Sequence, residues 1–117
     1  MLSDNTFPIK AGLWLCLATG LVASPVAAQQ APTREQSLIR MVRQDCGSCH
    51  GMHLTGGLGP ALTPVALADK PVESLAATIY GGRPGTPMPP WKAMLSEAEA
   101  TWIAQRLLAG FPQEARK

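Results

Sequence analysis

Apolar residues recur at helical spacing in three stretches of this chain, and segments rich in glycine and proline separate these stretches. The first stretch begins at Thr33, a residue type that caps helices, and Gln36 occupies the reciprocal position of a capping box. Leu38, Met41 and Val42 follow at positions i, i+3 and i+4, which places them on one face of a helix. The pattern therefore predicts an amphipathic helix in this stretch.

Two further helices are predicted, over residues 71–80 and 95–108. A proline suits the first turn of the former, and two consecutive glycines end it. The latter begins with a capping box of Ser96 and Glu99, and Gly110 ends it. Its apolar residues are Trp102, Ile103, Ala104, Leu107 and Leu108. No segment has the alternation that is typical of strands, so we expect an all-α fold with three main helices and long loops.

The loops between these helices carry two unusual compositions. Three of the four residues 56–59 are glycine, which predicts a backbone that passes close to a bulky group. Residues 83–91 place prolines and a glycine around Met88, so this segment is expected to be an irregular loop. The bulky group is expected to be a cofactor, for the reason given next.

The five residues 46–50, Cys-Gly-Ser-Cys-His, carry the most specific chemical signal in the chain. Two thiols at this spacing can add to the two vinyl groups on one edge of a porphyrin, and the following histidine is then held under the iron. The motif is the attachment signature of a c-type haem. It predicts one covalently bound haem c, with Cys46 and Cys49 as attachment points and His50 as an axial ligand, at the end of the first helix.

A Cys-x-x-Cys pair has two other interpretations, a thioredoxin-like redox centre and half of a zinc site. The redox centre needs a βαβ context, and the chain has no run of β-branched residues to supply one. A zinc site needs a second pair of ligands. The remaining candidates are Cys16, which lies far away in an apolar run, and His53. Both alternatives are therefore weaker than the haem.

The second axial ligand is expected to be Met88, in the segment Gly-Thr-Pro-Met-Pro-Pro-Trp at 85–91. A thioether is a soft, neutral ligand that raises the reduction potential, and flanking prolines restrict the backbone that presents it. Most methionines are core residues, but one between prolines in a loop is a poor core element. The weaker candidates are Met41, Met52, His53 and Met94, of which Met94 is the runner-up.

Residues 1–28 resemble a cleavable secretory signal peptide. Lys10 precedes an apolar run at 11–23, and the small residues at 26–28 offer a cleavage site. The run is shorter than the roughly 20 residues needed to span a bilayer. Cys16 is interpreted as an apolar filler rather than a lipidation site, because two large apolar residues precede it. The chain is therefore expected to be exported to the periplasm, with no stable membrane insertion after cleavage.

The 117 residues less these 28 leave one small domain of 89 residues. It would comprise a flexible start at 29–32, a folded part at 33–112 and a tail at 113–117. A chain this short buries a limited core and often needs an additional cross-link or bound group for stability, which a haem would supply. The formal net charge is +2 and no basic run occurs, so nucleic acid is not an expected partner. A monomer is expected.

Taken together, these features resemble a class I monohaem cytochrome c over residues 33–110. The resemblance is carried by the first helix leading into 46–50, by Gly-Pro-Ala-Leu at 59–62, by Met-Pro-Pro-Trp at 88–91 and by the last helix. It implies that the first and last helices cross. It also implies that the carbonyl of Pro60 accepts the other ring N–H of His50. The candidate donors to the haem propionates are Tyr80, Arg83 and Trp91.

Within this family the chain is most similar to the small cytochromes of the c55x type, which are made alongside cytochrome cd1 nitrite reductase in denitrifying bacteria. The similarity implies a periplasmic one-electron carrier that either donates to that reductase or serves an electron-transfer step in haem d1 maturation. With both axial positions filled, no catalytic residue is expected. The alternatives are a haem subunit or carrier serving another oxidase or dehydrogenase, and a peroxidase-like enzyme. The enzyme would need an open iron position and a distal group, for which only His53 is available.

Overall fold

The first helical run is continuous from residue 34 to residue 50, but its winding changes along the way. In the computed structural model, which describes residues 30–114, it consists of α1 (Arg34–Met41), a π-helical turn η1 (Val42–Cys46) and α2 (Gly47–His50). The predicted capping box is present: the Thr33 hydroxyl accepts from the backbone N–H of Gln36 at 3.2 Å. The sequence patterns predict the helix but not its widened turn.

The wide turn η1 lets two consecutive residues be buried in different surroundings. Val42 has no exposed surface and belongs to the main hydrophobic cluster, while the side chain of Arg43 is covered by the C-terminal segment. Single wide turns of this kind are rare and often occur at functional sites. Here the wide turn ends at Cys46, the first cysteine of the attachment motif.

Three more helices complete the described chain, and no strand occurs among residues 30–114, so the all-α class is confirmed there. They are α3 (Pro64–Leu67), α4 (Val72–Gly81) and α5 (Glu97–Ala109). The short α3, which was not predicted, starts where the Thr63 hydroxyl accepts from the N–H of Ala66. The predicted capping box of α5 is also present.

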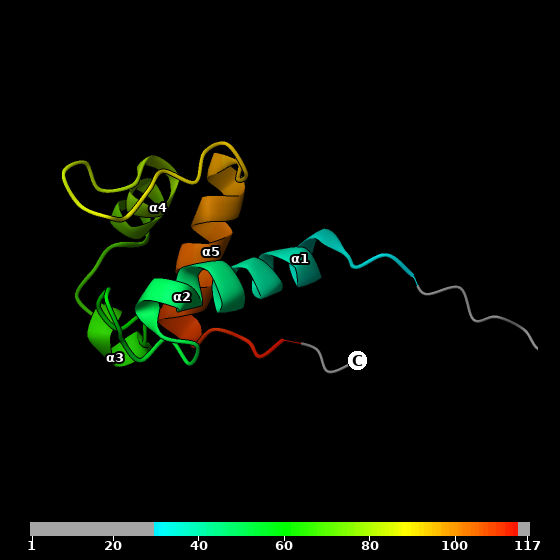
Figure 1. The fold of residues 1–117 in the computed structure, drawn as a ribbon, viewed down its shortest axis with the longest axis horizontal. Coiled ribbons are helices and arrows are strands. Elements are labelled where there is room, and N and C mark those ends of the chain that lie inside the picture. Colours follow the sequence, from blue (N-terminus) through cyan, green and yellow to red (C-terminus); the bar gives the residue numbers. More distant parts are fainter. Residues whose placement is uncertain (1–29, 115–117) are drawn as a thin grey trace, which may run out of the picture.

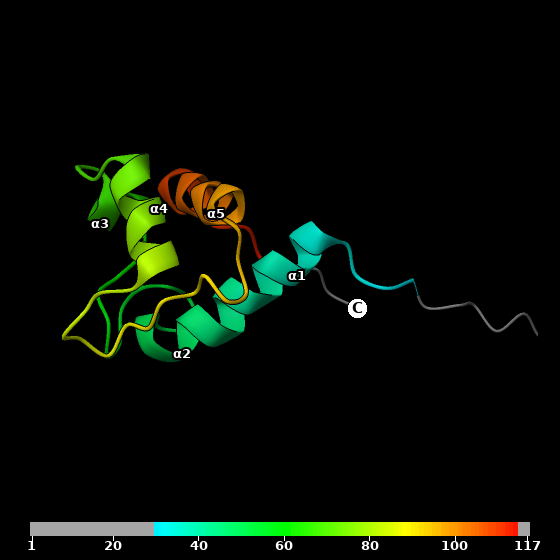
Figure 2. The same ribbon diagram turned by 90° about the horizontal axis from the view of Figure 1, so that it is seen from above.

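Two apolar clusters hold these helices together, and Figures 1 and 2 show how the helices are arranged. Alanines make the contact between α4 and α5, which allows their backbones to approach closely; these alanines are Ala76, Ala100 and Ala104. The larger cluster joins α1 to α5, and Figure 1 shows the two helices crossing. Its members from these helices include Leu38, Ile103 and Leu107. Trp102 packs against the same cluster from a partly buried position.

The segment that follows α5, residues 111–114, lies along the first helical run, and we call it the C-terminal strap. Phe111 is buried, and its ring meets that of Trp102 edge to face with centroids 6.3 Å apart. Glu114 forms an ion pair with Arg40 at 3.0 Å. The strap therefore fastens the last helix to the first.

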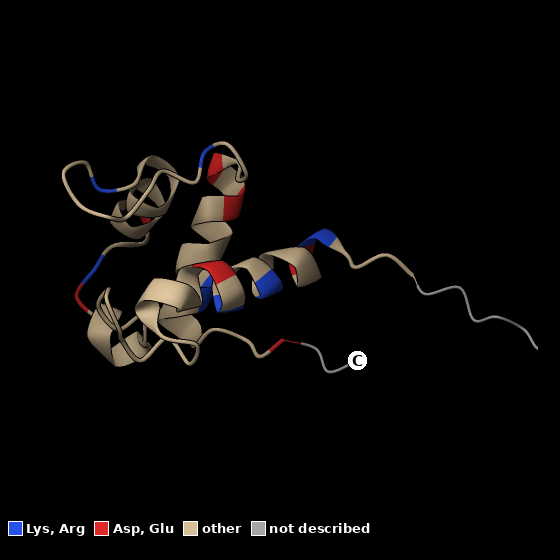
Figure 3. Cartoon of the chain, in the orientation of Figure 1, with Lys and Arg blue, Asp and Glu red and all other residues tan. Residues whose placement is uncertain are grey.

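Figure 3 shows that positions occupied by basic and acidic residues are interspersed along the described chain. None of the helices within residues 30–114 is long and apolar enough to cross a membrane. The predicted signal peptide at 1–28 lies outside the described residues.

The ion pair of Glu99 makes the stability of the fold depend on pH in the acid range. Arg34 donates from Nε to Oε1 of Glu99 at 2.5 Å, and the backbone N–H of Ser96 donates to the same carboxylate. These contacts lower the pKa of the Glu99 carboxyl from its ordinary value of 4.5 to about 2. Because the folded pKa is the lower one, the contribution is fully present above about pH 4.5 and is lost as the pH falls through about 2.

We expect Glu99→Gln to lower the melting temperature near neutral pH and to flatten its fall with acid between about pH 4.5 and pH 2. Calorimetry across this pH range checks the effect. Glu97→Gln is the matched control, because it removes the same charge from the same helical turn, two residues earlier, where no ion pair to Arg34 is present. Parallel pH profiles for the wild type and Glu99→Gln would contradict the assignment.

Candidate functional site

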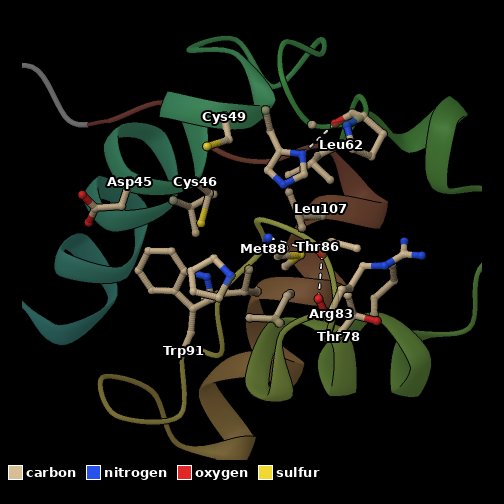
Figure 4. A pocket seen from close by; sticks show the side chains of 18 of the residues that line it. Asp45, Cys46, Cys49, Leu62, Thr78, Arg83, Thr86, Met88, Trp91 and Leu107 are labelled. Carbon is tan, nitrogen blue, oxygen red and sulfur yellow. Dashed lines mark hydrogen bonds between the residues drawn. The ribbon is translucent and has the colours of Figure 1, made fainter.

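A cavity of about 790 Å³ lies between the attachment motif and the loop that carries Met88 (Figure 4). Every described helix contributes to its walls. Most of the lining is apolar, and its members include Val42, Leu62, Leu75, Ile79, Ile103 and Leu107. A volume of several hundred Å³ with apolar walls and a few polar groups is typical of cofactor sites.

The motif residues Cys46, Cys49 and His50 all line this cavity. Cys46 is half-buried and Cys49 is exposed, and both are free thiols. Burial, with a smaller contribution from the charge of Asp45, raises the pKa of the Cys46 thiol to about 11. The two thiols therefore line the same cavity but differ in burial, Cys46 being the more buried.

His50 is oriented by a hydrogen bond to the loop that follows it. Its Nδ1 lies 2.7 Å from the carbonyl oxygen of Pro60, as the family resemblance implies. Because a carbonyl can only accept, Nδ1 carries the proton of this bond. In the neutral ring Nε2 then has a free lone pair, which is the form that binds a metal.

The glycine-rich loop passes close to this imidazole. A Cβ atom at Gly59 would lie 2.7 Å from Cε1 and 2.8 Å from Nδ1 of His50, closer than real Cβ atoms approach other groups. The loop also returns to the end of α2, where the N–H of Gly59 donates to the carbonyl of Cys49 at 2.8 Å. The glycine composition predicts a close approach to a bulky group. At position 59 that group is the histidine ring, rather than a cofactor directly.

Met88 reaches the cavity from the opposite loop. The carbonyl of Met88 accepts from the N–H of Arg83 at 3.1 Å, which closes the loop on itself. Gly82 has a φ of 68°, and a Cβ atom there would lie 2.6 Å from the nitrogen of Pro90. The N–H of Trp91 donates to the end of α4, at the carbonyl of Ile79. Backbone contacts, and not the prolines alone, therefore hold this loop.

The weaker ligand candidates lie elsewhere. Met52 and Met94 are exposed by 59% and 53%, and neither lines the cavity. His53 is exposed and is also absent from the lining. Met41 does line it, but from α1, in the helical run that also carries the cysteines. Within the described residues, no group of three or more His, Cys, Asp or Glu side chains could hold a metal ion.

The structure separates the three residues that were candidates for contact with propionates. Arg83 and Trp91 line the cavity, and Figure 4 shows Arg83 across it from the two cysteines. Tyr80 is not part of the lining and packs against the alanine cluster between α4 and α5. Lys70 does line the cavity, although sequence analysis did not single it out. A lone lysine in a loop carries no local signal of such a position.

Comparisons with known proteins were consistent with one another. A family profile described as "Cytochrome C oxidase, cbb3-type, subunit III" matches residues 33–105. The chain is 55% identical to cytochrome c55X of Pseudomonas aeruginosa over 84% of this chain and 85% of that protein. It is 33% identical to dihydro-heme d1 dehydrogenase of the same species, over 84% of this chain but 19% of that protein. A solved structure, "c-type cytochrome NirC", matches with a TM-score of 0.66 and 57% identity, covering 69% of this chain and 95% of that one.

Gly59→Ala is expected to disturb His50. Since the new Cβ atom would lie 2.7 Å from the ring, the imidazole or the loop must move, and the hydrogen bond to Pro60 should lengthen. Such overpacking typically costs about 1–3 kcal/mol of unfolding free energy. Denaturant titration measures this cost, and NMR of the His50 ring reports its displacement.

Gly81→Ala is the matched control for this substitution. A Cβ atom at Gly81 meets nothing within 4 Å, and the residue ends a helix without a positive φ. Alanine there should be neutral or slightly stabilising. Equal stability of the two variants would show that Gly59 is not needed for the close approach.

Proposed function

Because this chain belongs to the class I monohaem cytochromes c, of the c55X type, we propose that it carries single electrons through one haem c covalently held in the 790 Å³ cavity. The chain is an electron-transfer cytochrome and not an enzyme. The observation that carries the proposal is that Met88, which is distant in sequence, lines the same cavity as Cys46, Cys49 and His50 of the attachment motif.

The residues present fit this cofactor. Cys46 and Cys49 would form the two thioether bonds, and the imidazole of His50 and the thioether of Met88 would be the axial ligands. The apolar walls suit a large flat ring, and the donor set is soft and neutral. When bound, the haem supplies one-electron exchange between Fe³⁺ and Fe²⁺.

The protein's own contribution is to hold both ligands in place. The hydrogen bond to Pro60 fixes the tautomer and orientation of His50, and Gly59 supports the ring from one side. The closed loop around Met88 limits the movement of its sulfur. A site that is held in one geometry needs little rearrangement when its charge changes.

Electron exchange also requires an accessible edge. Cys49 is exposed, and Leu58, which lines the cavity, has 94% of its surface exposed. We propose that a redox partner docks on this apolar edge through a small, transient interface.

We further propose that the protein acts in the periplasm, after removal of residues 1–28, as an electron donor to cytochrome cd1 nitrite reductase. Similarity to cytochrome c55X supports this placement. A second role is an electron-transfer step in haem d1 maturation. It is favoured by the similarity of this chain to a part, 19%, of a dihydro-heme d1 dehydrogenase.

An electron-transfer assay tests the function. The purified haem protein is reduced, nitrite is added with a catalytic amount of cytochrome cd1 nitrite reductase, and reoxidation is followed optically. We expect fast reoxidation that needs both the reductase and nitrite. With an intact His/Met spectrum but no reoxidation, the role as a donor to this reductase would be excluded, and maturation of haem d1 would be tested next.

Met88→Ala tests the axial ligand. Loss of the thioether is expected to lower the reduction potential and to let CO bind rapidly to the reduced protein, which the wild type should not do. Optical redox titration and CO-binding kinetics measure the two effects. Met94→Ala is the control, because its side chain is exposed and lies outside the cavity. A wild-type spectrum and potential in Met88→Ala would show that another residue is the ligand.

A further inference from the structure

Arg43 is the only buried charged residue among residues 30–114, with 7% of its surface exposed. It lies in η1, between Val42 and Cys46, both of which line the cavity. A guanidinium is a permanent cation, and taking it out of water is costly unless its donors are satisfied. Arg43 is not part of the cavity lining, so the proposed haem ligation makes no use of it.

The partners of Arg43 are neutral. Its Nε donates to the carbonyl of Pro112 at 3.0 Å, and its Nη2 donates to the carbonyl of Phe111 at 2.6 Å. The guanidinium carbon also lies 5.5 Å from the centroid of the Phe111 ring. These contacts satisfy hydrogen-bond donors but supply no negative charge. No ion pair involves Arg43 within the described part of the chain.

The acid on the C-terminal strap is engaged by another cation. Glu114 accepts from Arg40 at 3.0 Å and from the amide of Gln44 at 3.4 Å. The charges of Arg40 and Glu114 therefore offset each other, and among the described residues no carboxylate, Asp45 at the cavity included, forms an ion pair with Arg43. Because Arg43 is buried, solvent and salt screen its field much less than that of a surface charge.

We propose that Arg43 raises the reduction potential of the site. In this proposal the C-terminal strap shields the guanidinium from water and fixes its position on the helical run that carries the cysteines. The inference rests on the proposed function. Reduction of Fe³⁺ to Fe²⁺ takes one electron from the redox partner and removes one positive charge from the site. A fixed neighbouring cation therefore favours the reduced form, and no proton moves to or from the chain.

The test compares the midpoint potentials of holoproteins by optical redox titration at low and high salt. Arg43→Met and Arg43→Gln remove the charge, and the glutamine can still donate to a carbonyl of the strap if the methionine variant folds poorly. Arg43→Lys keeps the charge but loses the forked geometry. Arg106→Met is the matched control, since it removes an exposed cation that stacks on Trp102.

We expect both neutral variants to have lower potentials than the wild type at both salt concentrations. Arg43→Lys should keep the wild-type potential while unfolding at lower denaturant, and Arg106→Met should match the wild type at high salt. A merely structural role would make the potential of Arg43→Lys fall with its stability. That result, or unchanged potentials in Arg43→Gln and Arg43→Met, would overturn the inference while leaving the carrier function intact. A wild type without covalent haem would overturn both.

Discussion

The core and the cavity of this protein share the same walls, and the rest of the structure depends on that constraint. Of the eight buried residues in the main hydrophobic cluster, five also line the cavity: Val42, Leu67, Leu95, Ile103 and Leu107. A domain of this size has few apolar residues to spare, so it cannot build a separate core and a separate cofactor site. The helices are therefore arranged around the site, and the contact of α1 with α5 forms one of its walls.

Local signals in the sequence were sufficient for the features that depend on a few neighbouring residues. The capping boxes at Thr33 and Ser96 need only residues three positions apart, and both occur as predicted. The η1 turn and the position of Tyr80 in the alanine cluster depend on contacts across the fold. Such contacts leave no periodic pattern, so the sequence offered Tyr80 as a candidate propionate donor without showing that it packs on the alanine cluster.

The two proposed axial ligands lie on opposite sides of the cavity, and at each a glycine allows a close backbone contact. His50 lies against Gly59 and donates a hydrogen bond to the Pro60 carbonyl. Met88 is held by a loop that closes against Gly82. In each case a glycine allows another backbone or ring to approach more closely than any side chain would permit. The composition of both loops indicated crowding, but the crowding group could be identified only from the three-dimensional arrangement.

The C-terminal strap illustrates how a terminal segment can matter without any sequence motif. Sequence analysis placed a boundary at residue 112 and treated the following residues as a tail, yet Glu114 contacts the first helix. Stability alone does not explain why Arg43 lies beneath this strap. A buried ion is often no more stabilising than an apolar side chain of similar volume, although removing one partner of an existing contact is harmful. The two strap carbonyls satisfy the donors of Arg43 without neutralising it, so the arrangement preserves a positive charge beside the attachment motif, where a redox site would respond to it.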